Sequence, residues 1–111
     1  MGIYQFNSII VTGYSDDIEK AHTIARGFFE NNVTEITSME ANNIKFFFIA
    51  LNGEKYENTR SEEQKRKRKQ FLFSMKNTFG LGSSLYWIEV TYGENFDIPE
   101  ITHHKYSSII L

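Results

Sequence analysis

Residues 44–51 read Ile-Lys-Phe-Phe-Phe-Ile-Ala-Leu, a stretch with one charged side chain and three consecutive phenylalanines. The side chains of a β-strand alternate between its two faces. This stretch therefore presents two sets, Ile44, Phe46, Phe48 and Ala50 on one face and Lys45, Phe47, Ile49 and Leu51 on the other. Both sets are mainly apolar, which predicts a strand inside a sheet that is covered on both sides.

The composition predicts one domain over residues 1–111. Hydrophobic residues make up 41% of the chain, enough for a core that needs no disulfide or metal. The absence of cysteine excludes disulfide scaffolds, thiol nucleophiles and cysteine-based zinc sites. No segment approaches the roughly 20 apolar residues of a membrane span, and the first residues lack the features of a signal peptide. We therefore expect a cytoplasmic protein that does not enter a membrane.

The net charge of -2 conceals an uneven distribution. Residues 60–69 carry six basic and two acidic side chains, a local charge of +4 that leaves -6 on the rest of the chain. A basic segment on an acidic body indicates contact with phosphates, and so with nucleic acid, or with an acidic protein.

The amino-terminal part predicts a strand followed by a helix. Residues 4–12 end in a β-branched run and suit a central strand. Ser15, Asp16 and Asp17 then mark a helix start, with the serine as cap and the carboxylates at the positive end of the helix dipole.

This helix is expected to be amphipathic and to end at Asn31-Asn32, residues that tolerate the left-handed conformation. Residues 33–41 alternate and are polar enough for an edge strand. Asn42-Asn43 would form a two-residue turn into the Phe-rich strand.

A polar link over residues 54–59 leads to a second helix, capped by Thr59 or Ser61 and ended by Gly80. The next strand is predicted at residues 85–92, where Leu, Trp, Glu and Thr alternate with Tyr, Ile, Val and Tyr. The chain then resembles a loop as far as Pro99, and residues 106–111 predict a last short strand.

The resulting order is β-α-β-β-α-β with a carboxyl-terminal extension. It predicts an α+β fold of the ferredoxin-like type, an antiparallel sheet with both helices on one face. The second face would then lack a cover although its strands are apolar. Three candidates for that cover are the chain over residues 96–111, a second copy of the protein, or a ligand.

The sequence supports no catalytic or metal site and no cofactor. His22, His103 and His104 are the only residues suited to acid–base work near neutral pH, and no Asp or Glu follows any of them at the i+3 or i+4 spacing that would complete a metal site on a helix. The glycines of residues 79–84 follow a helix, whereas phosphate-binding loops precede one, so Gly80 is interpreted as a helix end.

The order β-α-β-β-α-β is also that of RNA-recognition modules, which stack bases on sheet aromatics. Phe46 and Phe48 occupy the matching third-strand positions. Lys45 and Phe47 stand where such modules have glycines, the first strand lacks the matching aromatic, and the body is acidic. Core packing is therefore the favoured role for both phenylalanines.

Residues 11–39 resemble the first half of a small-molecule-binding regulatory module of the ACT type. The resemblance lies in Val-Thr-Gly at residues 11–13, the acidic helix start and the strand that follows the helix. It implies a ligand at the turn formed by Gly13, Tyr14, Ser15 and Asp16. Asp17 and Ile18 replace the Pro-Gly of that turn, so the resemblance is one of architecture.

The second helix combines two unusual features. Arg68 and Gln64 occupy the stripe that Leu72, Met75 and Phe79 continue, which predicts that the first half of the helix overhangs the sheet. Its other side places a partner-binding set on one face, Arg66, Lys69, Phe73 and Lys76. The alternative is a solvated helix whose Phe73 packs on the first helix.

These observations favour a small non-enzymatic regulator or inhibitor that acts by protein–protein interaction, of the kind that phages and other mobile elements encode. The partner would be another protein or a second copy in a homodimer. The alternatives are a nucleic-acid-binding module that uses residues 60–69 and an ACT-like module that senses a small molecule at the Gly13 turn.

Overall fold

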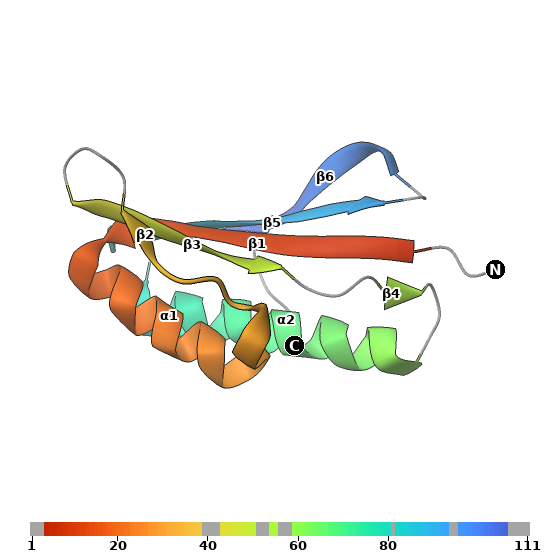
Figure 1. Cartoon of the computed structure of the whole chain (residues 1–111), viewed down its shortest axis with the longest axis horizontal. Coiled ribbons are helices and arrows are strands. Elements are labelled where there is room, and N and C mark those ends of the chain that lie inside the picture. Colours follow the sequence, from red (N-terminus) through yellow and green to blue (C-terminus); the bar gives the residue numbers. More distant parts are fainter. Residues whose placement is uncertain are drawn as a thin grey trace.

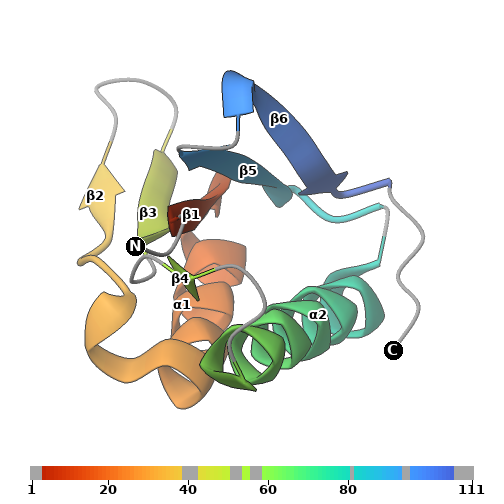
Figure 2. The same cartoon turned by 90° about the vertical axis from the view of Figure 1, so that its right-hand side faces the viewer.

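The protein forms a sheet with two helices packed on one of its faces (Figures 1 and 2). A computed structural model describes residues 4–38, 43–50, 54–55, 59–80, 82–93 and 96–106. Its elements are β1 (Tyr4–Tyr14), α1 (Ser15–Phe29), a 3-10 turn η1 (Glu30–Asn32), β2 (Thr37–Ser38), β3 (Ile44–Ala50), β4 (Glu54–Lys55), α2 (Thr59–Phe79), β5 (Tyr86–Gly93) and β6 (Phe96–His104). The predicted α+β class and the placement of both helices on one face are confirmed.

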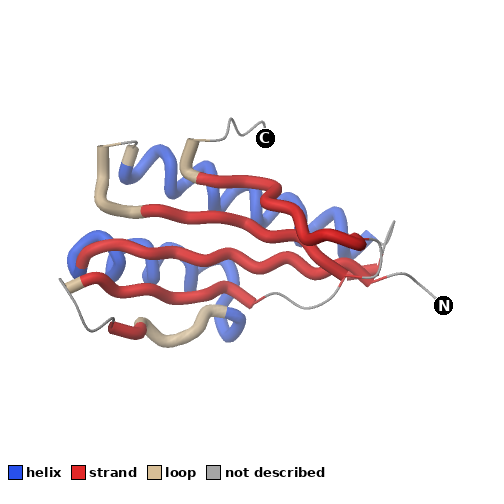
Figure 3. The backbone as a smooth tube through the Cα atoms, turned by 90° about the horizontal axis from the view of Figure 1, so that it is seen from above, coloured by secondary structure: helices blue, strands red, loops and turns tan. Residues whose placement is uncertain are grey.

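The sheet has the strand order β2-β3-β1-β5-β6, and β4 pairs with β1 outside this path. Every pairing is antiparallel. Figure 3 shows the strands from above, with the helices behind them. β1 lies between β3 and β5, which confirms the prediction that residues 4–12 form a central strand.

Cross-strand register aligns the core residues in rows. Val11 pairs with Phe47 on one side and with Trp87 on the other. Ile9 likewise lies between Ile49 and Glu89. Paired residues project to the same face, and all of these side chains are buried beneath the helices. The alternation of residues 44–50 therefore assigns Phe47 and Ile49 to the core.

α1 packs on this face through Ile18, Ala21 and Ala25, all fully buried. Asp16 and Asp17 lie in its first turn as expected. The helix already includes Ser15, and its N-cap residue, Tyr14, makes no side-chain cap hydrogen bond. The predicted Ser15 cap is therefore wrong.

The end of α1 also differs from the prediction. α1 ends at Phe29, and Glu30 rather than Asn31-Asn32 adopts a positive φ, 48°. The chain then makes one 3-10 turn before β2.

α2 ends as predicted, because Gly80 has φ 67° and its N–H donates to the carbonyl of Lys76 at 2.9 Å. The helix already includes both Thr59 and Ser61, so neither is its N-cap residue. Arg68 is only 5% exposed. The first half of α2 therefore does not overhang the sheet at Arg68, which lies against β5.

The edges of the sheet hold the other differences. Only Thr37 and Ser38 of the predicted edge strand form β2, and Thr37 pairs with Phe46, whereas a two-residue turn at Asn42-Asn43 would pair it with Phe48. The link over residues 54–59 contains β4. Asn42 itself lies outside the described residues.

The carboxyl-terminal segment was mispredicted. β6 (Phe96–His104) includes Pro99 in a segment expected to be a loop. An edge strand tolerates proline because one side of its backbone needs no ladder hydrogen bond. Tyr106 lies in a turn, and residues 107–111, the rest of the predicted last strand, lie outside the described residues.

Candidate functional site

The sheet face that points away from α1 and α2 carries no other described helix (Figure 1). We call it the open face. Strand alternation and register place on it Phe6, Ser8, Ile10 and Thr12 of β1, Phe46, Phe48 and Ala50 of β3, Tyr86, Ile88, Val90 and Tyr92 of β5, and Ile101 and His104 of β6.

Aromatic side chains dominate the open face and remain accessible. Phe48 is 41% exposed, Tyr86 57% and Tyr92 39%. Phe46 and Phe48 contact each other with ring centroids 5.5 Å apart, and Phe6 stacks on Tyr92 at the same distance. The prediction that Phe46 and Phe48 serve core packing is therefore wrong, because no described element covers them.

The chain over residues 96–106 does not cover this face either. β6 instead extends the sheet beside β5, and its Ile98 and Ile101 are 77% and 62% exposed. Since Ile101 pairs with Val90, it adds to the exposed apolar surface. The predicted cover by the extension is thus wrong for its described residues.

None of the residues named above is an Asp, Glu, Lys or Arg, although the buried Lys105 places its Nζ 4.5 Å from the ring centroid of Tyr86 at the rim of this face. Its polar members are two hydroxyl residues of β1, the tyrosine hydroxyls and His104, and Ser8 Oγ lies 3.3 Å from the hydroxyl of Tyr92. Such depletion of charge with enrichment of aromatic residues is typical of the buried centre of protein interfaces.

The predicted basic set lies on α2. Arg66 is exposed, Lys69 and Lys76 are half-buried, and Phe73 is 38% exposed. Arg66 and Lys69 line a shallow hollow with other residues of the same helix. The aromatic contacts between α2 and α1 are made by Phe71, with Phe28 and Phe29.

Two of the four residues of the predicted ligand turn line a common hollow. Tyr14 and Asp16 line a shallow hollow with Asp17 and Asn43. Gly13 is buried, and the side chain of Ser15 lies outside the description. The backbone N–H of Tyr14 donates to Ser84 Oγ at 3.3 Å, and that hydroxyl donates to Asp17 at 2.8 Å. The turn is therefore held by Ser84, and its two carboxylates suit a cation better than an anion.

A buried polar cluster joins α2 to β5 and β6. Glu89 is 2% exposed, and its Oε2 forms an ion pair with Arg68 Nε at 3.0 Å. Its other oxygen, Oε1, accepts a hydrogen bond from Thr102 Oγ1 at 2.7 Å and lies 2.8 Å from His103 Nδ1. The register places Glu89 in a core row beside Ile9. A carboxylate buried there needs a partner, and Arg68, Thr102 and His103 provide it.

A carboxylate that orients an imidazole is one component of an acid–base site. Here the same carboxylate also pairs with Arg68 and Thr102, so we interpret the cluster as the connection between the helix and the sheet edge. The sequence contained its signal. Arg68 lies on the core stripe of α2, and Glu89 lies on the same strand face as Trp87. Two opposite charges at core positions indicate a buried ion pair, which we did not predict from the sequence.

Among the described residues, no three His, Asp or Glu side chains come together as a metal site would need. Neither described helix is long and apolar enough to cross a membrane. Comparisons with protein-family models, curated proteins and solved structures found no match. The functional argument therefore rests on the surfaces described above.

Proposed function

We propose that this protein is a small non-enzymatic regulator that acts by protein–protein interaction, and that a second copy of the chain docks on its open face. The observation that carries the proposal is the accessible aromatic surface around Phe48 and Tyr86. We also infer that the fold is a ferredoxin-like variant, because β2-β3-β1-β5 follows the order of that arrangement and β6 extends it.

The energetic argument concerns the cost of leaving this face in water. Burying one large apolar side chain contributes about 1.5–3 kcal/mol, and the net stability of a domain is only about 5–15 kcal/mol. Several half-exposed aromatic and aliphatic residues on one continuous sheet surface therefore favour an occupant that removes them from water.

Charge favours a second copy as that occupant. Outside residues 60–69 the chain carries -6, so two copies repel each other over most of their surface. The residues that we assign to the open face carry no charged side chain. In a two-fold dimer each patch meets its own equivalent, which an uncharged surface permits without like-charge contacts. Both α2 helices would then lie on the outside.

The experiment is sedimentation velocity on matched variants. Wild-type protein is expected to be a dimer, and Phe48→Asp a folded monomer, because each interface would then bury two carboxylates. Phe73→Asp is the control, since Phe73 on α2 has a similar exposed fraction, 38% against 41% for Phe48. It should remain a dimer. A monomeric wild type, or equal loss of dimer in both variants, contradicts the proposal.

Nucleic-acid binding is the second candidate, and the exposure of Arg66 and of the lysines around it favours it. The open face itself suits this function less well. Its aromatics resemble a base-stacking platform, but single-strand binding also requires cations that follow the phosphates. Lys105, the cation that lies over the open-face ring of Tyr86, is 2% exposed and donates to the carbonyl of Ser83, so a polyanion would bind better to the exposed cations of α2.

A further inference from the structure

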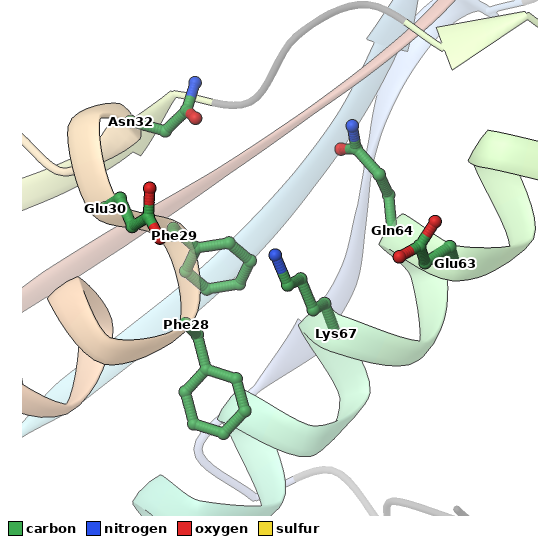
Figure 4. Close-up of a pocket in the computed structure, with 7 residues that line it drawn as sticks. All are labelled: Phe28, Phe29, Glu30, Asn32, Glu63, Gln64 and Lys67. Carbon is green, nitrogen blue, oxygen red and sulfur yellow. The ribbon is translucent and has the colours of Figure 1, made fainter.

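A cleft separates the end of α1 from the first half of α2 (Figure 4). Phe28, Phe29 and Glu30 line it from one side, and Glu63, Gln64 and Lys67 from the other. Its volume is about 320 Å³, which falls at the small end of the range of ligand pockets.

The base of the cleft is aromatic and firmly packed. The rings of Phe28 and Phe29 lie 6.1 Å apart, and Phe71 of α2 contacts both edge-on at 6.0 and 5.4 Å. Phe71 is fully buried. The apolar surface of the cleft is therefore preformed and joined to the core.

The walls carry unpaired charges of both signs. Glu30, Glu63 and Lys67 are exposed, and no ion pair among the described residues joins them. In Figure 4 the Lys67 side chain reaches across the opening toward Phe29, while the half-buried Gln64 offers an amide beside it. A ligand that bridges the walls between α2 and the end of α1 would meet the Lys67 ammonium and the Glu30 carboxylate.

Glu30 is unfavourable in this position for two local reasons. Its backbone has φ 48° and ψ -112°, a conformation that side-chain-bearing residues rarely adopt. Its carboxylate also follows the negative end of the α1 dipole. The nearest cation of α1, Arg26, pairs with Glu35 instead. Strained residues of this kind gather at ligand sites.

We propose that this cleft binds a small zwitterion with an apolar body. The Lys67 ammonium would bind its carboxylate, Glu30 on the opposite wall would bind its ammonium group, and the Phe28 and Phe29 rings would contact the apolar part. This assignment gives one partner to a charge on each wall, Lys67 on α2 and Glu30 after α1, which a purely anionic or purely cationic ligand would not do.

The test is an NMR titration of the full chain with phenylalanine as the probe. Amide shifts are expected at residues 29–32 and 63–67, with saturation below about 10 mM. Phenethylamine lacks the carboxylate and 3-phenylpropionate lacks the ammonium group, so each should bind at least about tenfold more weakly. Absence of shifts at these amides, or equal binding of either analogue, would overturn the proposal.

Variants separate the site from general surface charge. Lys67→Met should weaken phenylalanine binding about tenfold or more, whereas Lys65→Met should leave it unchanged, because Lys65 lines a different hollow of α2. Glu30→Gly should raise the melting temperature by relieving the backbone and still weaken binding. Equal effects of the two lysine variants, or a Glu30→Gly variant that binds as wild type, would also overturn it.

Discussion

The two faces of the sheet differ in a way that their strand residues alone do not reveal. Phe47 and Phe48 are neighbours on β3, yet Phe47 is fully buried and Phe48 is 41% exposed. Trp87 and Tyr86 on β5 show the same contrast, at 2% and 57%. Alternation decides which face a side chain joins, whereas the position of the helices decides whether that face is covered.

The two faces also differ in charge, and the charged residues lie on the buried face. The helix-covered face contains the buried ion pair of Arg68 and Glu89, while none of the residues assigned to the open face is an Asp, Glu, Lys or Arg. On the covered face, both oxygens of Glu89 lie within ion-pair or hydrogen-bond distance of a partner, whereas the buried indole Nε1 of Trp87 has no hydrogen-bond partner among the described residues. The open face has apolar groups without a cover, which is the condition of an interface.

The sharpest test of this contrast compares Phe47→Ala with Phe48→Ala. Phe47→Ala should lower the free energy of unfolding by about 3–5 kcal/mol, because it opens a cavity in the core. Phe48→Ala should lower it by about 1 kcal/mol or less at dilutions where the protein is monomeric. Urea denaturation measures both values. Equal losses would show that the open face is covered in the monomer.

The sequence predicted the central elements well, because their signals are local. The alternation of residues 44–50, the central β1, the apolar stripe of α1 and the end of α2 at Gly80 were all predicted correctly. Each depends on side-chain period or on one residue with special backbone freedom.

The edges and the candidate sites were harder to predict, because they depend on contacts between distant segments. β6 was missed since Pro99 and polar residues resemble a loop, yet pairing with β5 makes the segment a strand. The cluster of Glu89, Arg68 and His103 assembles residues of three elements. Exposure of Phe48 depended on the path of the extension, which the sequence left open.

The buried ion pair can be tested on the covered face. Arg68→Met should lower the free energy of unfolding by about 3–5 kcal/mol, because the buried carboxylate of Glu89 would lose its guanidinium partner at Oε2. Arg66→Met, two residues away on the exposed side of α2, should change it by about 0.5 kcal/mol or less.

The double variant Arg68→Met with Glu89→Leu completes this cycle. It should recover much of the loss, since removing both charges leaves no unpaired group of the ion pair. Chemical denaturation of the wild type, Arg68→Met, Glu89→Leu and the double variant gives the coupling energy of the pair. If Arg68→Met is as mild as Arg66→Met, the pair contributes little and the covered face tolerates an unpaired carboxylate.

A third test concerns the junction between β1 and α1, where Gly13 packs closely against Leu85. A Cβ at Gly13 would lie 2.6 Å from Cδ2 of Leu85, which is fully buried. Gly13→Ala should therefore cost about 1–3 kcal/mol through overpacking. Gly27→Ala is the control, because a Cβ there meets nothing within 4 Å and should stabilise α1 by about 0.5–1 kcal/mol. Thermal denaturation should show shifts of opposite sign.

The smallest expected effect on stability concerns the outer side of α2. This surface is basic, whereas the residues assigned to the open face are uncharged. Replacing Arg66 and Lys69 together with Glu should change the free energy of unfolding by about 1 kcal/mol or less, because exposed charges are well solvated. The same change should lower the salt concentration at which the protein elutes from heparin, since fewer cations meet the polyanion. The dimer expected from the open face should persist, because neither residue lies on it. An unfolded variant would show that this side of α2 is structural, and an unchanged elution would show that polyanions bind elsewhere.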